Sequence, residues 1–222
     1  MDAVFFDMDG LLVDTEKVWL ELETEVMARL GGEWTPEHQT RLVGGSMERT
    51  VEYMLAVSGS DVSPRVLRSW MLDGMVSRLS GGVEAMPGAL ELLDALRAER
   101  VPTALVTSSL KEIAKGVLTF VGRDRFDAIV TADDVTRTKP DPEPYLTAVS
   151  ILGVDATRCV VLEDSPNGVA AGTAAGCAVL AVPSLIPIEE APGRLVADSL
   201  SGVTVPMLRD LSARHLRLLN AG

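Results

Sequence analysis

Short apolar runs alternate along the chain with longer stretches in which apolar residues recur every three or four positions. Several short runs show no polar alternation, which is typical of parallel β-strands that are covered on both faces. The longer stretches predict amphipathic helices between the strands, and this alternation favours a doubly wound α/β sheet with right-handed crossovers. The strands are expected at residues 4–6, 103–106, 128–130, 160–162 and 179–182, and the helices at residues 89–100, 110–121, 142–152 and 168–175.

The segment between residues 15 and 86 differs from the rest, because it contains no convincing strand. Apolar residues at helical spacing run from Trp19 to Leu30 and stop at a pair of glycines, which predicts a helix with a glycine end. A threonine or serine followed by proline is typical of a helix start. Two such starts are expected at Thr35-Pro36 and Ser63-Pro64, the second leading into a helix whose apolar face holds Val66, Trp70 and Met71.

This segment interrupts the α/β pattern directly after the first strand. We therefore expect two domains, namely a Rossmann-like core of residues 1–14 and 87–222 and an inserted helical bundle of residues 15–86. The return link contains the pairs Gly81-Gly82 and Pro87-Gly88, which suit a hinge.

Composition narrows the class of partner. The chain has 222 residues, with 20 Lys and Arg against 32 Asp and Glu, and a formal net charge of -12. This excess repels nucleic acids and anionic membrane surfaces, so neither is expected as a partner. A small phosphorylated substrate stays compatible, since local groups or a metal ion override the distant field. Without an evident apolar surface stripe, a monomer is expected.

Cysteine usage and apolar runs point to a cytoplasmic location. Cys159 and Cys177 lack the spacing of a zinc or redox motif, and their apolar surroundings predict buried free thiols. The first apolar run reads as core, so no signal peptide is expected. Residues 165–188 carry no charge, but interspersed glycines and prolines favour a buried helix and a buried strand over a membrane span.

Acidic residues follow two of the expected strands. Asp7 and Asp9 share one side of an extended chain, and paired carboxylates need a cation or a shared proton to coexist. Oxygen ligands of this kind suit Mg²⁺. Glu163 and Asp164 follow another strand, where buried acids also need a cation or a hydrogen-bond donor. Each pair, taken alone, is equally consistent with a solvated loop.

Hydroxyl groups and one lysine lie at two further strand ends. Thr107 and Ser108, with the backbone N–H groups of their turn, suit a phosphate oxygen. They also suit the N-cap of the following helix, and the two interpretations are compatible. Lys139 begins a proline-fixed turn, and a lone lysine is most typical of a solvated surface charge.

Together and in this order, the four groups resemble the motifs of the haloacid dehalogenase superfamily of phosphotransferases. The matching residues are Asp7-Met8-Asp9-Gly10, Thr107, Lys139 and Glu163-Asp164, and the resemblance covers the whole chain. The inserted bundle resembles the cap of the helical-cap subfamily, and residues 6–16 are similar to the start of its beta-phosphoglucomutase-like sugar phosphatases. The resemblance implies a phosphoric monoester hydrolase acting on a small phosphorylated metabolite, most simply a sugar phosphate.

The resemblance also implies catalytic roles. Asp7 would be the nucleophile that forms an aspartyl-phosphate, and Asp9 would act as general acid and then as general base. Thr107 and Lys139 would hold the phosphoryl oxygens, and Lys139 would offset the repulsion between the phosphate and Asp7.

A metal site and a moving cap follow from the same resemblance. Mg²⁺ would be held by the Asp7 carboxylate, the Asp9 backbone carbonyl and Asp164. Glu163 would lie close by or reach the ion through water. The cap would close over the substrate, exclude bulk water and supply specificity.

Two cap positions separate the possible activities. In the sugar phosphomutases of this subfamily a proton-carrying histidine stands where this chain has Trp19, and an indole cannot carry that proton. The arginine that binds a second phosphate there falls at Met47, and Arg49 replaces it only if the loop register differs. We therefore predict a phosphatase, with a phosphomutase and a catalytically idle sensor of phosphorylated ligands as alternatives. Trp19 itself suits either the cap core or the pocket wall.

Overall fold

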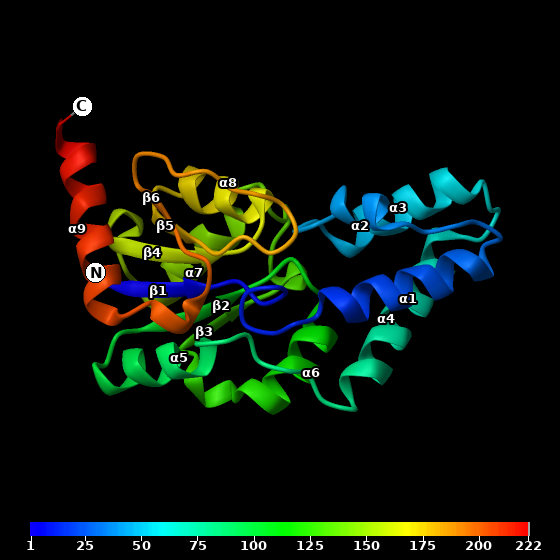
Figure 1. Ribbon diagram of the computed structural model, residues 1–222, viewed down its shortest axis with the longest axis horizontal. Helices are drawn as coiled ribbons and strands as arrows, with labels where there is room; N and C mark the ends of the chain where they lie inside the picture. Colours follow the sequence, from blue (N-terminus) through cyan, green and yellow to red (C-terminus); the bar gives the residue numbers. More distant parts are fainter. Residues whose placement is uncertain (222) are drawn as a thin grey trace.

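A parallel six-stranded sheet lies at the centre of the larger part of the molecule, in a computed structural model that describes residues 1–221 (Figure 1). Its strand order is β3-β2-β1-β4-β5-β6, so the direction of winding reverses between β1 and β4. Ligands bind beside the carboxyl ends of strands at such a reversal. The strands are β1 (Ala3–Phe6), β2 (Thr103–Val106), β3 (Ala128–Val130), β4 (Cys159–Glu163), β5 (Ala178–Ala181) and β6 (Arg194–Val196).

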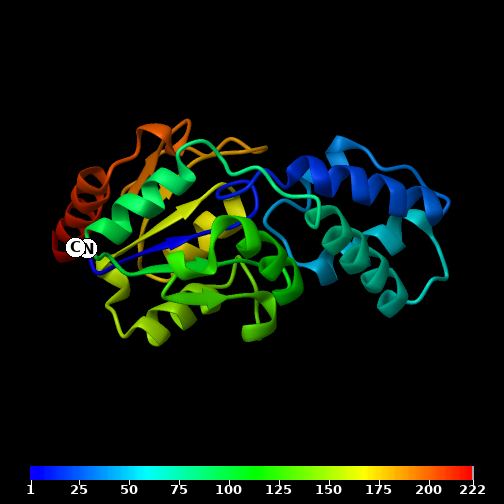
Figure 2. The ribbon, with the colours of Figure 1, turned by 90° about the horizontal axis from the view of Figure 1, so that it is seen from below.

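Helices cover both faces of the sheet (Figure 2). Because neighbouring side chains on a strand alternate, Phe6 packs with one apolar cluster and Phe5 with the other. The first cluster includes residues of α5 (Ala89–Ala98), α6 (Lys111–Val121) and α9 (Val205–Ala221). The second includes residues of α7 (Glu143–Leu152) and α8 (Pro166–Ala174). Short 3-10 turns lie at Arg123–Arg125, Ala132–Asp134, Ala156–Arg158 and Leu200–Gly202. The predicted doubly wound α/β class is confirmed.

The sixth strand was not expected from the sequence. β6 has three residues, begins with an arginine and is half-buried along its length, as suits an edge strand. So short a run, without a continuous apolar core, leaves no clear strand pattern.

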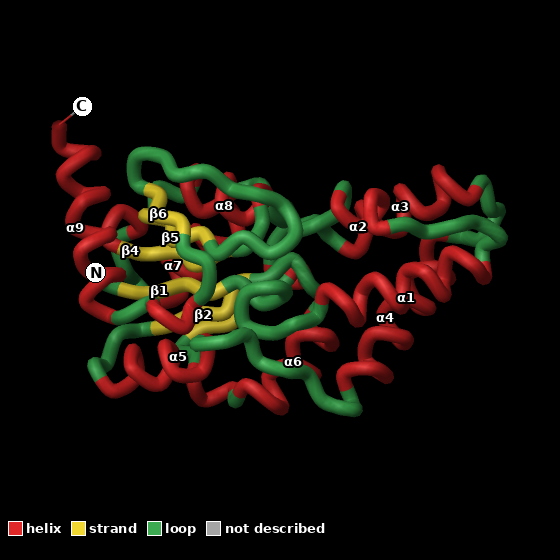
Figure 3. The backbone as a smooth tube through the Cα atoms, in the orientation of Figure 1, coloured by secondary structure: helices red, strands yellow, loops and turns green. Residues whose placement is uncertain are grey.

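Four helices form the cap beside the carboxyl ends of the strands, and Figure 3 shows helices and loops there without strands. They are α1 (Glu16–Arg29), α2 (Pro36–Thr40), α3 (Met47–Ser58) and α4 (Pro64–Leu79). The hydroxyl of Ser46 accepts a hydrogen bond from the Arg49 backbone N–H, and that of Ser63 accepts one from Val66. Both are N-cap contacts that satisfy free N–H groups at a helix start.

The buried face of α4 differs from the expected one. Val66 is 41% exposed, and the face that packs inward consists of Leu67, Met71, Met75 and Leu79. These four recur every four positions, whereas Val66 lies one residue off that row. Trp70 is half-buried beneath the guanidinium of Arg29, 3.5 Å from the ring centre. The predicted place of Met71 in the core is confirmed.

Two linkers join cap and core and run side by side. The backbone N–H of Asp14 donates to the Glu84 carbonyl, and that of Met86 donates to the Leu12 carbonyl, both at 2.9 Å. Val13 and Ala85 form an antiparallel bridge between these contacts. The expected division near residues 14 and 86 falls on this paired crossing, and its use as a domain boundary stays a prediction.

The uncharged stretch at residues 165–188 contains α8 and β5, joined by a turn. Among residues 1–221, no helix is long and apolar enough to cross a membrane. Cys159 and Cys177 are free and buried, as predicted. Burial raises the pKa of the Cys159 thiol to about 12.

Gly88 and Gly176 allow a matched test of backbone packing, because both have a φ of +84°. A Cβ on Gly88 would collide with the backbone of Leu200 and Ser201, whereas one on Gly176 would meet nothing within 4 Å. We expect Gly176→Ala to lower the free energy of unfolding by about 1–2 kcal/mol, because alanine is strained in the left-handed conformation. Gly88→Ala should lower it by at least about 2 kcal/mol more, because its Cβ also collides with the backbone. Urea unfolding measures both losses, and equal losses would contradict the packing described here.

Candidate active site

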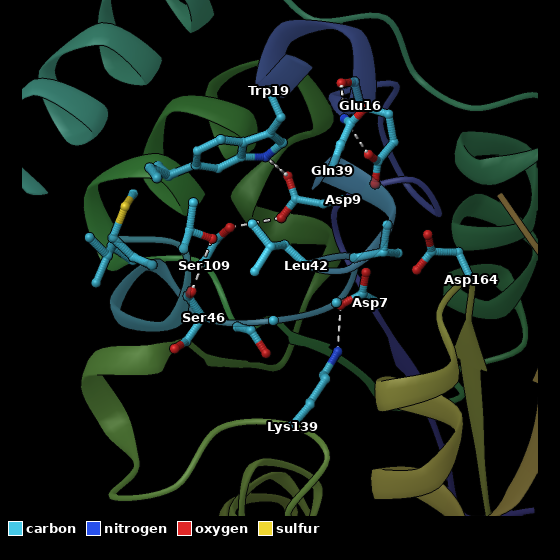
Figure 4. Close-up of a pocket in the computed structure, with 18 of the residues that line it drawn as sticks. Asp7, Asp9, Glu16, Trp19, Gln39, Leu42, Ser46, Ser109, Lys139 and Asp164 are labelled. Atoms are coloured by element: carbon cyan, nitrogen blue, oxygen red, sulfur yellow. Dashed lines mark hydrogen bonds and ion pairs between the residues drawn. The ribbon is translucent and has the colours of Figure 1, made fainter. Parts of the chain in front are cut away.

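The carboxyl edge of the sheet brings Asp7, Lys139, Glu163 and Asp164 together. Asp7 follows β1, Glu163 ends β4, and Lys139 arrives from the loop between β3 and α7. Each is less than a tenth exposed. Figure 4 shows Asp7, Lys139 and Asp164 at the floor of a cavity between this edge and the cap. The cavity holds about 730 Å³, including the solvent at its mouth.

Lys139 is the centre of the buried charges. Its Nζ donates hydrogen bonds to Asp7 Oδ1 at 2.5 Å, Glu163 Oε1 at 2.6 Å and the Val106 carbonyl at 2.8 Å. Three acceptors match the three protons of an ammonium group. Burial alone would lower the pKa of Lys139, but the carboxylates of Asp7 and Glu163 raise it above its ordinary value. A solvated surface lysine, which a lone lysine first suggested, is therefore wrong here.

Glu163 is fully buried and bound on both of its oxygens. Oε1 accepts from Lys139 and from the Tyr145 hydroxyl at 2.7 Å, while Oε2 accepts from the backbone N–H of Asp164 at 3.1 Å. Ser165 adds two longer hydrogen bonds to Oε2. A side chain on Gly168 would collide with this carboxylate, so glycine is required where α8 approaches it. Glu163 thus holds Lys139 in place, and the contact of Tyr145 with Glu163 was not predicted from the sequence.

Three carboxylates here face a single lysine. One oxygen from each of Asp7, Glu163 and Asp164 lies within 4.8 Å of the others. Burial raises the pKa of Asp7 well above its ordinary value, although Lys139 lowers it. Burial, followed by the Glu163 carboxylate, raises the pKa of Asp164 as well. A divalent cation would relieve this excess negative charge, and carboxylate oxygens are the ligands that Mg²⁺ prefers.

Asp9 points away from this group and toward the cap (Figure 4). Its Oδ1 accepts hydrogen bonds from the Thr15 hydroxyl at 2.6 Å and the Trp19 indole N–H at 3.2 Å. Its Oδ2 accepts from the Ser109 hydroxyl at 2.8 Å. Trp19 therefore lies in the pocket wall and also packs against the buried apolar cluster, so both places predicted for it hold in part. Thr15 and Ser109 lie within or directly beside the resembling stretches, but no role beside Asp9 was predicted for either of them.

The two predicted phosphate-binding hydroxyls differ in their surroundings. Ser108 lines the cavity, and its buried Oγ has no hydrogen-bond partner among residues 1–221. Thr107 is 1% exposed and lies outside the lining, where its Oγ1 accepts from the Ser109 N–H at 3.0 Å. Helix α6 has Leu110 as its N-cap, without a side-chain contact, so the alternative role of both hydroxyls as N-caps is wrong. The Ser108 hydroxyl is free to bind an oxygen of a ligand.

The cap positions that distinguish mutase from phosphatase are clear in the structure. Met47 is buried and lines the cavity. Arg49 is exposed, donates to the Arg41 carbonyl at 3.4 Å, and lines a separate groove on the cap surface. Arg49 therefore does not supply a cation to the cavity in place of Met47.

Two glutamates of α1 in the cavity wall were also missed. Burial raises the pKa of both Glu16 and Glu23 to about 7, with Asp9 as the next cause for Glu16. Both fall within an amphipathic helix pattern, and a glutamate there usually marks the solvent face. No sequence signal separates a solvent face from a face that lines a cavity.

Glu23→Gln is expected to stabilise the protein at neutral and alkaline pH. The pKa of Glu23 is about 7 in the fold against an ordinary value of 4.5, so the unfolded chain releases this proton first as the pH rises. The free energy of unfolding therefore falls as the pH rises from 4.5 to 7, and the loss reaches about 3 kcal/mol at higher pH. The glutamine variant does not show this loss, because its side chain does not titrate. Glutamine keeps an oxygen to accept the Trp34 hydrogen bond.

Urea unfolding at pH 4 and pH 8 measures this difference. Glu21→Gln, on the exposed side of α1, is the matched control and should change stability equally little at both values. A Glu23→Gln variant with no gain at pH 8 over pH 4 would show that Glu23 is not a strained acid.

The sequence of the chain is similar to those of known proteins. A sequence model of haloacid dehalogenase-like hydrolases matches residues 4–182. Over 212 residues, 90% of this chain and 92% of the relative, the chain is 35% identical to hexitol phosphatase A of Escherichia coli. It is 33% identical over 177 residues to fructose-1-phosphate phosphatase YqaB of the same organism, covering 78% and 92% of the two chains.

Solved structures agree on the fold. Beta-phosphoglucomutase from Clostridium difficile superposes with a TM-score of 0.86 at 21% identity, over 98% of this chain and 99% of that one. CbbY from Rhodobacter sphaeroides gives 0.83 at 25% identity, over 94% and 99%. The predicted family and fold are thus confirmed, and the chain belongs to the haloacid dehalogenase-like hydrolases.

Proposed function

We propose that this protein is a Mg²⁺-dependent phosphatase that hydrolyses a small phosphorylated metabolite, a sugar or sugar-alcohol phosphate, through an aspartyl-phosphate. The observation that carries the proposal is the buried contact between Lys139 and Asp7 at the floor of the cavity. A carboxylate so close to a fixed cation can attack a phosphate without full charge repulsion. The relatives named as hexitol and fructose-1-phosphate phosphatases support the substrate class.

Asp7 is oriented to act as the nucleophile. Lys139 binds its Oδ1, while Oδ2 accepts no hydrogen bond from residues 1–221. In the first step, Oδ2 attacks phosphorus and the bond from phosphorus to the substrate's ester oxygen breaks. In the second step, water attacks the same phosphorus and releases Asp7 and inorganic phosphate. Splitting one displacement into two easier ones is the advantage of such covalent catalysis.

Asp9 is placed to move the protons of both steps. Protonated, it donates to the leaving alkoxide, and as a carboxylate it then takes a proton from the attacking water. The hydroxyls of Thr15 and Ser109 and the indole N–H of Trp19 fix its orientation. Two of these donors, Thr15 and Trp19, fall within residues 15–86 of the cap, so closing the cap completes the orientation of the acid.

The residues present fit a magnesium ion. Carboxylate oxygens of Asp7 and Asp164, with the backbone carbonyl of Asp9, would hold it, and Glu163 would stay bound to Lys139. The Ser184 hydroxyl donates to Asp164 Oδ2 at 2.6 Å and so fixes that ligand. When bound, the ion neutralises negative charge shared between Asp7 and the phosphate.

Phosphomutase activity is disfavoured by the cap. The Trp19 indole only donates a hydrogen bond and cannot carry a proton between groups. Met47 offers no charge to a second phosphate, and Arg49 lies outside the cavity. A catalytically idle sensor is disfavoured in turn, because a binding protein needs neither a free nucleophilic oxygen nor a fixed acid.

Asp7→Asn tests the central claim. The amide is a poor nucleophile, so release of inorganic phosphate from sorbitol 6-phosphate and from p-nitrophenyl phosphate should fall at least about 1,000-fold. Asp61→Asn, at an exposed loop position of the cap, is the matched control and should keep full activity. Retained turnover by a folded Asp7→Asn variant would remove Asp7 as the nucleophile.

Asp164→Asn tests the metal site. Loss of one anionic ligand should raise the Mg²⁺ concentration needed for half-maximal phosphate release by about 10-fold or more. Activity is titrated with Mg²⁺ after treatment with a chelator. A titration curve identical to that of the wild type would displace Asp164 from the metal site.

A further inference from the structure

The cap contributes acidic and amide groups to the cavity wall. Glu16 and Glu23 belong to α1, and Gln39 belongs to α2. The two glutamates are seven positions apart, which places them on one helix face about 10 Å apart along the axis. Because α1 begins beside the core and runs outward into the cap, Glu23 lies farther from the sheet than Glu16 (Figure 1).

Glu23 has no cation to balance its charge. It is 5% exposed, and its Oε2 accepts one hydrogen bond, from the Trp34 indole N–H at 2.9 Å. Its Oε1 accepts none, and no lysine, arginine or histidine within residues 1–221 forms an ion pair with it. A buried carboxylate with one neutral donor destabilises a fold. The catalytic steps above do not use it, so the acid needs another explanation.

Glu16, two turns earlier on the same face of α1, is fixed in orientation by Gln39. The Gln39 side-chain amide donates to the Glu16 carbonyl at 2.8 Å and to its Oε2 at 3.1 Å (Figure 4). Gln39 is itself 7% exposed. A carboxylate held in this way keeps lone pairs that can accept further hydrogen bonds.

The wall of the cavity carries far more negative than positive charge. Its lining contains five carboxylates and, among the described residues, one cation, and that cation already has three acceptors. A second phosphate or a carboxylate on a substrate would therefore meet like charge without compensation. Hydroxyl groups would instead donate charge-assisted hydrogen bonds to the same carboxylates. The carboxylates are those of Asp7, Asp9, Glu16, Glu23 and Asp164.

We propose that Glu23, supported by Glu16 and Gln39, binds the hydroxyl groups at the far end of a singly phosphorylated polyol and rejects substrates that carry a second anionic group there. With the phosphate beside Asp7 and Ser108, the hydroxylated carbon chain would run outward along α1. The inference rests on the proposed function and names what the cap selects within it.

Sorbitol 6-phosphate and 6-phosphogluconate form a matched pair for the test. They share the carbon chain, the inner hydroxyls and the phosphate, and differ at the far end, which is a hydroxymethyl group in one and a carboxylate in the other. We expect the wild type to favour sorbitol 6-phosphate by about 100-fold in kcat/KM. Glu23→Gln should reduce that ratio by about 10-fold or more, since it removes both the strong acceptor and the repulsion.

The ratio is measured within one preparation, so incomplete folding cancels. Glu21→Gln, on the exposed side of the same helix, should leave the ratio unchanged. If Glu23→Gln does not fold, Glu16→Gln replaces it with the same expected direction.

The outcomes separate this inference from the proposed function. If the wild type releases phosphate from neither compound nor from p-nitrophenyl phosphate, the phosphatase proposal fails, and this inference fails with it. If p-nitrophenyl phosphate is hydrolysed but sorbitol 6-phosphate is not preferred, or the ratio is the same in Glu23→Gln, this inference alone is overturned.

Discussion

The buried ammonium of Lys139 is the interaction on which the rest of the site depends. Its three hydrogen bonds reach Asp7 after β1, the Val106 carbonyl of β2 and Glu163 of β4. These are three adjacent inner strands of the sheet, so the lysine finds its partners only when the strands are aligned. A desolvated cation without them would be strongly unfavourable. The Asp7 carboxylate, the proposed nucleophile, is therefore positioned by the same contacts that hold the carboxyl edge together.

One lysine cannot balance the acids around it, and that imbalance shapes both halves of the cavity. On the core side, three buried carboxylates lie close together, and the pKa values of Asp7 and Asp164 are raised mainly by burial. A divalent cation and a phosphate would share that floor. On the cap side, Glu23 has no such relief, and its burial lowers stability at neutral pH. The protein thus keeps an unfavourable acid where a ligand can contact it, a common pattern at functional sites.

The sequence sufficed for the fold class and for most of the catalytic edge, for a simple physical reason. Continuous apolar runs identify buried parallel strands, and topology brings residues at their carboxyl ends together. The burial of Lys139 was not visible, since its partner Asp7 lies 132 positions away in the chain. Tyr145 and Glu23 were missed because helical spacing does not tell which neighbour a face meets. Val66 was assigned to the buried face of its helix for the same reason. The short edge strand β6 was not predicted, because its three residues show no clear strand pattern.

Core and cap carry different kinds of information about function. In the proposed reaction the core groups would bind a metal ion and a phosphoryl group, and any phosphate ester can supply the latter, so these groups would define the reaction and leave the substrate open. The cap would determine the choice of substrate, both by the cationic and proton-carrying groups that are missing from its wall and by the carboxylates that are present there. Met47 stands where a cation would hold a second phosphate, and Trp19 donates to Asp9 without accepting a proton. With Glu16 and Glu23 as the remaining charged cap groups in the wall, a neutral hydroxylated chain is the ligand whose polar groups all find partners there.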